Sequence, residues 1–200
     1  MRRTLFVLIM TLSQMSAGFA QAAEPAGPVG LEYRQRLPGV RMEKDEQGQV
    51  VYLEVANDKF TNADAVHIGR IPTLKSVSLF ATAVTDDGMT FLQHLPHLES
   101  IAIIGLSLPD NTEKKCPFRG TGLAHLHPRA ELTSVNFSTS EFGDPARNLL
   151  LKEKSLKSVF LIDSNMTQQG IDLLRQGLPD ANIYGGKVFG TSFPGLSPAP

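Results

Sequence analysis

The sequence predicts an α/β solenoid, with a curved parallel sheet on the concave face and short helices on the convex face. The main observation is a repeated unit, a strand-like run followed by a helix-like run, that covers most of the 200 residues. Its starting points are 24 residues apart except for one interval of 34, and they are Val50, Leu74, Leu98, Leu132 and Leu156. A single unit of this kind cannot bury its own apolar side, so each one needs a neighbour.

The unit at residues 74–97 shows the pattern most clearly. Val77 and Leu79 alternate with outward residues, as in a strand with one buried side. Thr85 is predicted to cap a helix, and Asp86 places a favourable negative charge in its first turn. Pro96 ends the helix. The other predicted helix starts are Thr61 with Asp64, Asp144 with Pro145, and Thr167 with Gln168.

Three positions of the unit are apolar in all five copies and are predicted to form the core. The first holds Leu53, Val77, Ile101, Val135 and Val159. The second holds Val55, Leu79, Ile103, Phe137 and Leu161. The third holds Phe60, Val84, Phe118, Phe142 and Met166. Phe118 comes ten residues late in its copy, so the long interval contains an insertion, which we place within residues 107–117.

The strand pattern Leu-x-x-Val-x-Leu within a 24-residue period resembles a leucine-rich repeat. The stretches VTDDGMTFLQHLPHLESI and GTGLAHLHPRAELTSV are similar to the Thr-Asp-x-Gly-Leu-x-x-Leu repeats of exported bacterial proteins, particularly those of planctomycetes. The resemblance covers about residues 50–186 and implies an architecture without naming a ligand. The Asn that usually ends the strand is replaced by Asp58, Thr82, Leu106, Ser140 or Ser164, so we expect no continuous buried Asn ladder.

The first 22 residues have the three-part layout of a secretory signal peptide. Arg2 and Arg3 precede an apolar run, and small residues lead to a predicted cleavage site after Ala22. A retained membrane anchor is the alternative, but the apolar run is short and interrupted by polar residues such as Gln14. We therefore expect export to the periplasm or the extracellular space, with no membrane attachment after cleavage.

The remaining chain divides into three segments. Residues 23–39 are rich in Pro and Gly and are interpreted as a linker. The repeat domain is placed at residues 40–186, where a hairpin-like segment leads into the first unit. Residues 187–200 are interpreted as a flexible C-terminal tail.

Charge and cysteine content exclude several classes of function. The formal net charge is -1, from 19 basic and 20 acidic residues, so a basic surface for nucleic acid is not expected. Cys116 is the one cysteine, so no intramolecular disulfide can form. We interpret it as a passive loop thiol; an intermolecular disulfide or a reactive role is the alternative.

Outward strand residues are predicted to form three columns across the sheet. The first is Tyr52, Ser76, Ser100, Ser134 and Ser158; the second is Glu54, Ser78, Ala102, Asn136 and Phe160; the third is Ala56, Phe80, Ile104, Ser138 and Ile162. They combine small polar groups with a broken apolar strip, which is typical of a surface that binds a protein or peptide. The predicted partner-binding residues are Tyr52, Glu54, Ser78, Phe80, Ala102, Ile104, Asn136, Phe160 and Ile162. The alternative is that the tail or the inserted loop covers the strip.

No catalytic constellation is recognisable in the sequence. There is no Gly-x-Ser-x-Gly elbow, phosphate-binding glycine loop, His-Glu-x-x-His or paired Cys-x-x-Cys. The spacing of His94, His97, His125 and His127 would allow zinc binding, but ordinary surface positions explain it as well. We expect a protein that is not an enzyme, without cofactor or metal, and that binds a protein or peptide partner. The alternative is a structural component that self-associates through the apolar strip or the end of the solenoid.

Overall fold

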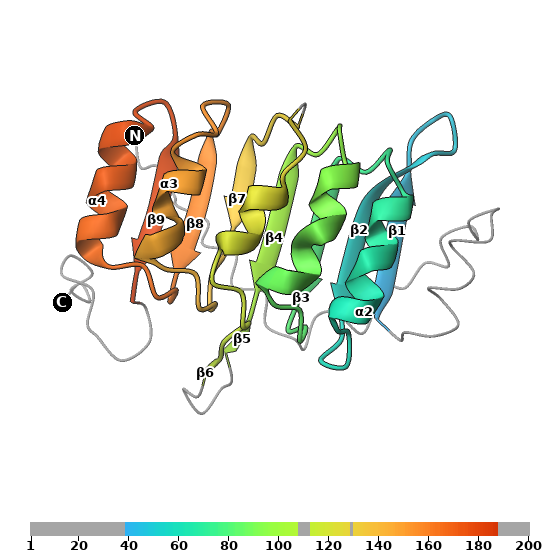
Figure 1. Ribbon diagram of the computed structural model, residues 1–200, viewed down its shortest axis with the longest axis horizontal. Coiled ribbons are helices and arrows are strands. Elements are labelled where there is room, and N and C mark those ends of the chain that lie inside the picture. Colours follow the sequence, from blue (N-terminus) through green and yellow to red (C-terminus); the bar gives the residue numbers. More distant parts are fainter. Residues whose placement is uncertain (1–38, 108–112, 129, 188–200) are drawn as a thin grey trace, which may run out of the picture.

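The computed structural model describes residues 39–107, 113–128 and 130–187. The expected signal peptide and nearly all of the expected linker and tail lie outside the described residues. One seven-stranded sheet crosses the whole domain, and short helices cover one of its faces (Figure 1). The fold is therefore α/β, as predicted.

The strands follow the chain in spatial order, and only the first is antiparallel to its neighbour. They are β1 (Val40–Lys44), β2 (Val50–Ala56), β3 (Ser76–Phe80), β4 (Ser100–Ile104), β7 (Ser134–Asn136), β8 (Ser158–Ile162) and β9 (Asn182–Gly186). From β2 onward, laterally paired residues are 24 apart in sequence, except between β4 and β7, where they are 34 apart. This register is the one that the alignment of the five starting points requires.

All three predicted core positions are buried on the helix side of the sheet. Side chains at the first two positions are at most 1% exposed in every unit. Three rings from the third and fourth units, those of Phe118, Phe137 and Phe142, pack with centroids 4.8 to 6.0 Å apart. Alternation along each strand thus divides the sheet into a wholly apolar face and an outward face.

The helical segments are α2 (Asn62–Ala65), α3 (Arg147–Leu150) and α4 (Gln168–Gly177) together with the 3₁₀ helices η2 (Val66–Arg70), η3 (Asp86–His94), η4 (Thr121–His125) and η5 (Asp144–Ala146). The helical segments of the third and fourth units are the shortest of the five. A five-residue strand is about 16 Å long. A 3₁₀ helix rises about 2 Å per residue, so the nine residues of η3 are about as long as the strand. An α-helix would need more residues to cover the same length.

Polar side chains connect the start of one helix to the start of the next. Asn62 Oδ1 accepts from Thr85 N at 2.9 Å, and Asn62 Nδ2 donates to Thr85 Oγ1 at 2.8 Å. Asp86 accepts from Arg119 N at 2.8 Å and from Gly122 N at 2.7 Å. Thr85 is the N-cap of η3, as predicted, but its side chain makes no capping hydrogen bond; its hydroxyl accepts one from Asn62 of the preceding unit.

The other predicted caps have mixed outcomes. Thr61 and Asp64 form a capping box, and the Thr167 hydroxyl accepts from the backbone N–H three residues later, as expected. In the fourth unit Gly143 is the N-cap, so the prediction for Asp144 is wrong. The Asp144 carboxylate instead accepts from Thr167 N at 3.0 Å and from Thr167 Oγ1 at 2.7 Å.

These connections explain the glycine that follows the helix start in the second, third and fifth units. A Cβ atom at Gly88, Gly122 or Gly170 would lie 2.4 Å from Asn62 Oδ1, 2.6 Å from Met89 Cγ or 2.2 Å from Asp144 Oδ1. Neighbouring helices approach so closely here that no side chain fits. The Thr-Asp-x-Gly pattern thus reflects contact between units as well as capping within one.

We expect Asp86→Ala to lower the free energy of unfolding by about 2 kcal/mol, because two backbone N–H groups lose a charged acceptor. Asp87→Ala is the matched control, since Asp87 is exposed on the same turn, and we expect it to change stability by less than about 0.5 kcal/mol. Urea denaturation of both variants gives the comparison. Equal losses would show that Asp86 acts only through its charge at the helix start.

The strands end in a repeated turn. Ala81, Thr139 and Asp163 have positive φ of 51 to 56° at the same place in three units. Buried Ser140 and Ser164 come next; each hydroxyl donates to a carbonyl three residues back and accepts from an N–H two residues on. In these two turns serine thus satisfies the backbone groups, at the position where the sequence analysis noted that the usual Asn is replaced.

The insertion forms a short hairpin at the edge where the strands end, seen below the sheet in Figure 1. Its strands are β5 (Leu106–Ser107) and β6 (Glu113–Lys114), and residues 108–112 lie outside the described part. Lys114 pairs with Asp58 at 3.7 Å, and Lys115 Nζ donates to Asn165 Oδ1 at 2.7 Å. The insertion therefore contacts loops of both the first and the fifth unit.

Candidate binding face of the sheet

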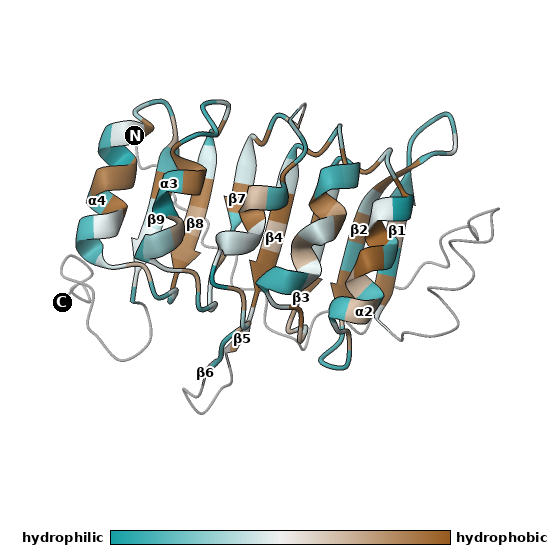
Figure 2. Ribbon diagram, viewed as in Figure 1, coloured by the Kyte–Doolittle hydropathy of each residue, from teal (hydrophilic) through white to brown (hydrophobic). Residues whose placement is uncertain are grey.

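The face of the sheet opposite the helices is the candidate binding surface. All nine predicted partner-binding residues lie on it and are partly exposed, because each alternates with a core residue of its strand. Glu54, Ser78, Ala102, Asn136 and Phe160 pair in a continuous lateral row. Figure 2 shows hydrophobic residues running through the strands and in bands on the helices.

The apolar strip divides into two patches. Phe80 and Ile104 are lateral neighbours on β3 and β4. Phe160 and Ile162 lie on β8, and Ser138 follows β7 between the two patches. A partner that used both would have to cross a polar row in the middle of the sheet.

The patch at the C-terminal end contains an aromatic pair that sequence reasoning missed. Tyr184 lies beside Phe160 in the register of β8 and β9, and the rings stack with centroids 4.8 Å apart and planes 10° apart. Tyr184 is 48% exposed, whereas the phenylalanines of the core are wholly buried. The three predicted columns of outward residues covered only five strands. A sixth strand with Ile183 facing inward would have placed Tyr184 on the outward face by alternation.

The N-terminal end of the same face is charged. Tyr52 donates its phenolic O–H to Glu54 Oε2 at 2.7 Å, and the Arg41 guanidinium lies 5.8 Å from the centre of the Tyr52 ring. Arg41 also pairs with Glu43. Burial, reinforced by the hydrogen bond to Glu54, raises the pKa of Tyr52 well above its usual range, so the phenol stays protonated.

The outward residues at the start of the strands form a small, polar row. Ser76, Ser100, Ser134 and Ser158 pair laterally across four strands, and Asn182 of β9 continues their row. The face thus changes from charged at β1 and β2, through the serine row and the apolar patch of Phe80 and Ile104, to aromatic at β8 and β9. Its two ends present different chemistry to a partner.

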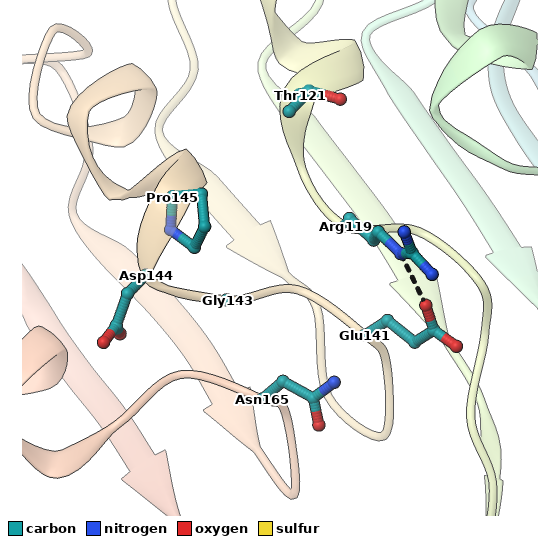
Figure 3. Close-up of a pocket in the computed structure, with 7 residues that line it drawn as sticks. All are labelled: Arg119, Thr121, Glu141, Gly143, Asp144, Pro145 and Asn165. Carbon is teal, nitrogen blue, oxygen red and sulfur yellow. Dashed lines mark hydrogen bonds and ion pairs between the residues drawn. The ribbon is translucent and has the colours of Figure 1, made fainter.

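A depression at the edge where the strands end is lined by residues of the third, fourth and fifth units (Figure 3). Arg119 Nε donates to Glu141 Oε2 across it at 2.8 Å. Asp144 already binds Thr167, and Asn165 already binds Lys115. The charged and amide side chains that line it already have hydrogen-bond partners, so the depression offers a ligand less than the sheet face does.

Cys116 is buried, which corrects its interpretation as a loop thiol. Its side chain is 1% exposed, and Sγ lies 3.6 Å from the carbonyl oxygen of Thr82. Burial raises the pKa of the Cys116 thiol to about 11. The thiol is therefore protonated at neutral pH and packs as a small apolar group.

The histidines do not gather around the thiol. His94, His97 and His125 are exposed at helix ends and loops. Within the described ranges, no group of three or more His, Cys, Asp or Glu side chains is placed to hold one metal ion.

No helix among the described residues is long and apolar enough to cross a membrane. Comparison with known proteins adds no assignment: no protein-family model matches the chain, and no curated protein matches it either. The sheet face must therefore be interpreted from its own chemistry.

Proposed function

We propose that this chain is an exported leucine-rich repeat protein that binds a protein or peptide, without catalysis, through the outward face of its sheet. The architecture is supported by parallel strands at a 24-residue interval, with short helices on one face only. Export is supported by the layout of residues 1–22.

The single observation that carries the binding proposal is the stacked pair of Phe160 and Tyr184. A large aromatic side chain that is half exposed on an open sheet leaves apolar area in water. Burial of aromatic area is a main source of affinity in protein interfaces, particularly near the centre of the contact. An apolar side chain of the partner is expected at this pair, with polar contacts along the neighbouring serine row.

The test is affinity capture with the mature chain, comparing the original protein with Phe160→Asp and Tyr184→Asp. The matched control is Val66→Asp, because Val66 is 51% exposed on the helix side. We expect the partners retained by Val66→Asp to be lost with both sheet variants. A partner list unchanged by Phe160→Asp and Tyr184→Asp would contradict the proposal.

The second candidate function is self-association, supported by the position of the aromatic pair at the last strand of the sheet. Size-exclusion chromatography with light scattering distinguishes the two. A dimer that Tyr184→Asp converts to a monomer would assign the pair to contact between copies. A monomer at all concentrations would leave partner binding as the better account.

A further inference from the structure

The two edge strands of the sheet differ in how they are protected from further pairing. β1 carries Arg41, Glu43 and Lys44 and has an irregular register between the last two, and charges and bulges of this kind keep an edge strand from pairing. β9, which lies with α4 at the other end of the domain (Figure 1), reads Asn-Ile-Tyr-Gly-Gly and has no charged side chain. Among the described residues, no strand pairs with its outer edge. Such an edge is a template for a further strand.

The backbone of β9 shows which groups point to that outer edge. Asn182 N donates to Lys157 O at 2.8 Å, so Asn182 directs its backbone groups toward β8. Because backbone groups alternate between the two sides of a strand, Ile183 and Gly185 direct theirs outward. Ile183 O accepts there from Arg175 Nη2 of α4 at 3.3 Å. A carbonyl oxygen has two lone pairs, so this bond leaves room for a second donor.

We propose that two copies of this chain pair antiparallel along the outer edges of their β9 strands, about a two-fold axis at Tyr184. The inference rests on the second candidate function, self-association, and specifies its contact. Residues whose backbone groups point outward form the hydrogen-bonded pairs, so Ile183 of each copy lies opposite Gly185 of the other. Tyr184 then lies opposite Tyr184 of the second copy, in a non-bonded pair on the axis.

The two neighbouring positions of the axis fit less well. An axis at Ile183 would place Gly185 opposite Ala181 of the second copy, whose N–H already donates to Leu178 O. An axis at Gly185 would place Ile183 opposite Lys187, which lies beyond the end of β9. The axis at Tyr184 is the one that pairs both outward residues of each strand with each other.

The side chains of β9 agree with this register on both faces of the sheet. On the helix side, the buried side chain of Ile183 lies beside Gly185 of the second copy, which has none. On the outward face, the stacks of Phe160 and Tyr184 from the two copies meet in one row of four rings. Phe160 of each copy stays on the outward face, so the contact preserves the surface proposed for a partner protein.

The charges on α4 favour a second copy as the occupant of this edge. A Cβ atom at Gly185 would lie 2.6 Å from Ile171 Cδ1, so the start of α4 lies level with the end of β9. Arg175, one turn later, reaches back to Ile183. The proposed axis therefore passes α4 between Asp172 and Arg175, and it turns each of these exposed charges toward its opposite on the second copy. Such complementarity selects a partner and fixes its orientation.

Single cysteines on the outward face of the mature chain test the register. Two Tyr184 Cα atoms would be about 4.5 Å apart, which a disulfide can span, whereas two Asn182 Cα atoms would be about 14 Å apart. We expect Tyr184→Cys to form disulfide-linked dimers about tenfold faster than Asn182→Cys at equal concentration. The unsubstituted chain controls for the buried thiol of Cys116. Equal rates for the two variants would overturn the register.

Mixed charge variants test the arrangement of α4. Arg175→Asp makes its outer side wholly acidic and Asp172→Arg makes it wholly basic, so the two variants should prefer each other to themselves. In an equimolar mixture measured by native mass spectrometry, we expect the ratio of heterodimer to homodimer to exceed the statistical value about fivefold. Differently labelled copies of the unsubstituted chain, the control, should give the statistical value. A statistical ratio for the variants would overturn the proposed axis.

Light scattering of the unsubstituted chain over a concentration series tests the association itself. We expect a monomer that converts to a dimer as concentration rises. A monomer at every concentration would overturn the inference. None of these three experiments contains a partner protein, so their failure leaves partner binding to be decided by affinity capture with Phe160→Asp. Conversely, capture that is unaffected by Phe160→Asp would contradict partner binding and leave the disulfide result standing.

Discussion

Replacing Gly105 by alanine is expected to lower the free energy of unfolding by about 3 kcal/mol, among the larger effects for a single methyl group. A Cβ atom at Gly105 would lie 2.0 Å from Thr139 O, 2.5 Å from Lys114 O and 2.9 Å from Cys116 N. All three are backbone atoms, so no side-chain rotation can relieve the overlap. Gly105 does not have positive φ, unlike Ala81, Thr139 and Asp163 at the same place in other units, so crowding alone requires glycine there.

Thermal and denaturant unfolding of Gly105→Ala measure this effect, with Gly143→Ala as the control. The nearest atom to a Cβ at Gly143 is Asn165 O at 3.5 Å, an ordinary contact, and its backbone is extended. We expect that control to change stability by less than about 1 kcal/mol in either direction. Similar losses for the two variants would mean that the insertion moves aside without cost.

Phe137→Ala is expected to cost about 4 kcal/mol, because a wholly buried ring leaves a cavity between two others. The Phe137 ring lies 5.0 Å from that of Phe118 and 4.8 Å from that of Phe142, measured between centroids. Phe118 follows the insertion, so these three rings join the inserted segment to the fourth unit. The loss should therefore appear in the cooperative unfolding of the whole domain.

The control for Phe137→Ala is Phe160→Ala, the same change on the outward face. Phe160 is partly exposed and stacks on one ring, so we expect a loss of about 1 kcal/mol. Denaturant midpoints with unchanged m-values give both numbers. A Phe160→Ala loss as large as that of Phe137→Ala would show that the outward aromatic pair stabilises the fold and is not kept free for binding.

The sequence was sufficient to predict the core and the register because both depend on periodicity. A buried position must be apolar in every unit, so Val77 and Leu79 identify their counterparts 24 residues away. Outward residues then follow by alternation, which is why the nine predicted residues lie on one face. Tyr184 needed one further strand in the same count.

The polar connections could not be predicted because their partners are distant in sequence. A Thr followed by Asp at a helix start has a local explanation, which is capping. In the folded chain the Asp86 carboxylate binds backbone groups 33 and 36 residues later, and the Thr85 hydroxyl is taken by the preceding unit. Only the approach of neighbouring helices creates these bonds.

The burial of Cys116 could not be predicted from the sequence either. The one long interval between starting points located the insertion. The composition of the insertion did not indicate that the chain at its end packs against the loop of the fourth unit. Cys116 N donates to Thr139 O and Cys116 O accepts from Glu141 N, so the backbone there is held on both sides. A residue in a polar insertion thereby becomes part of the interior.

The inserted hairpin has a mechanical consequence. The loops after β2 and β8 are about 19 Å apart at the usual strand spacing, and Lys114 and Lys115 bind one of them each, through Asp58 and Asn165. A change in the bending of the sheet would alter that distance and strain both contacts. The hairpin therefore links the loops of the first and fifth units at this edge, and both of its contacts depend on the curvature of the sheet.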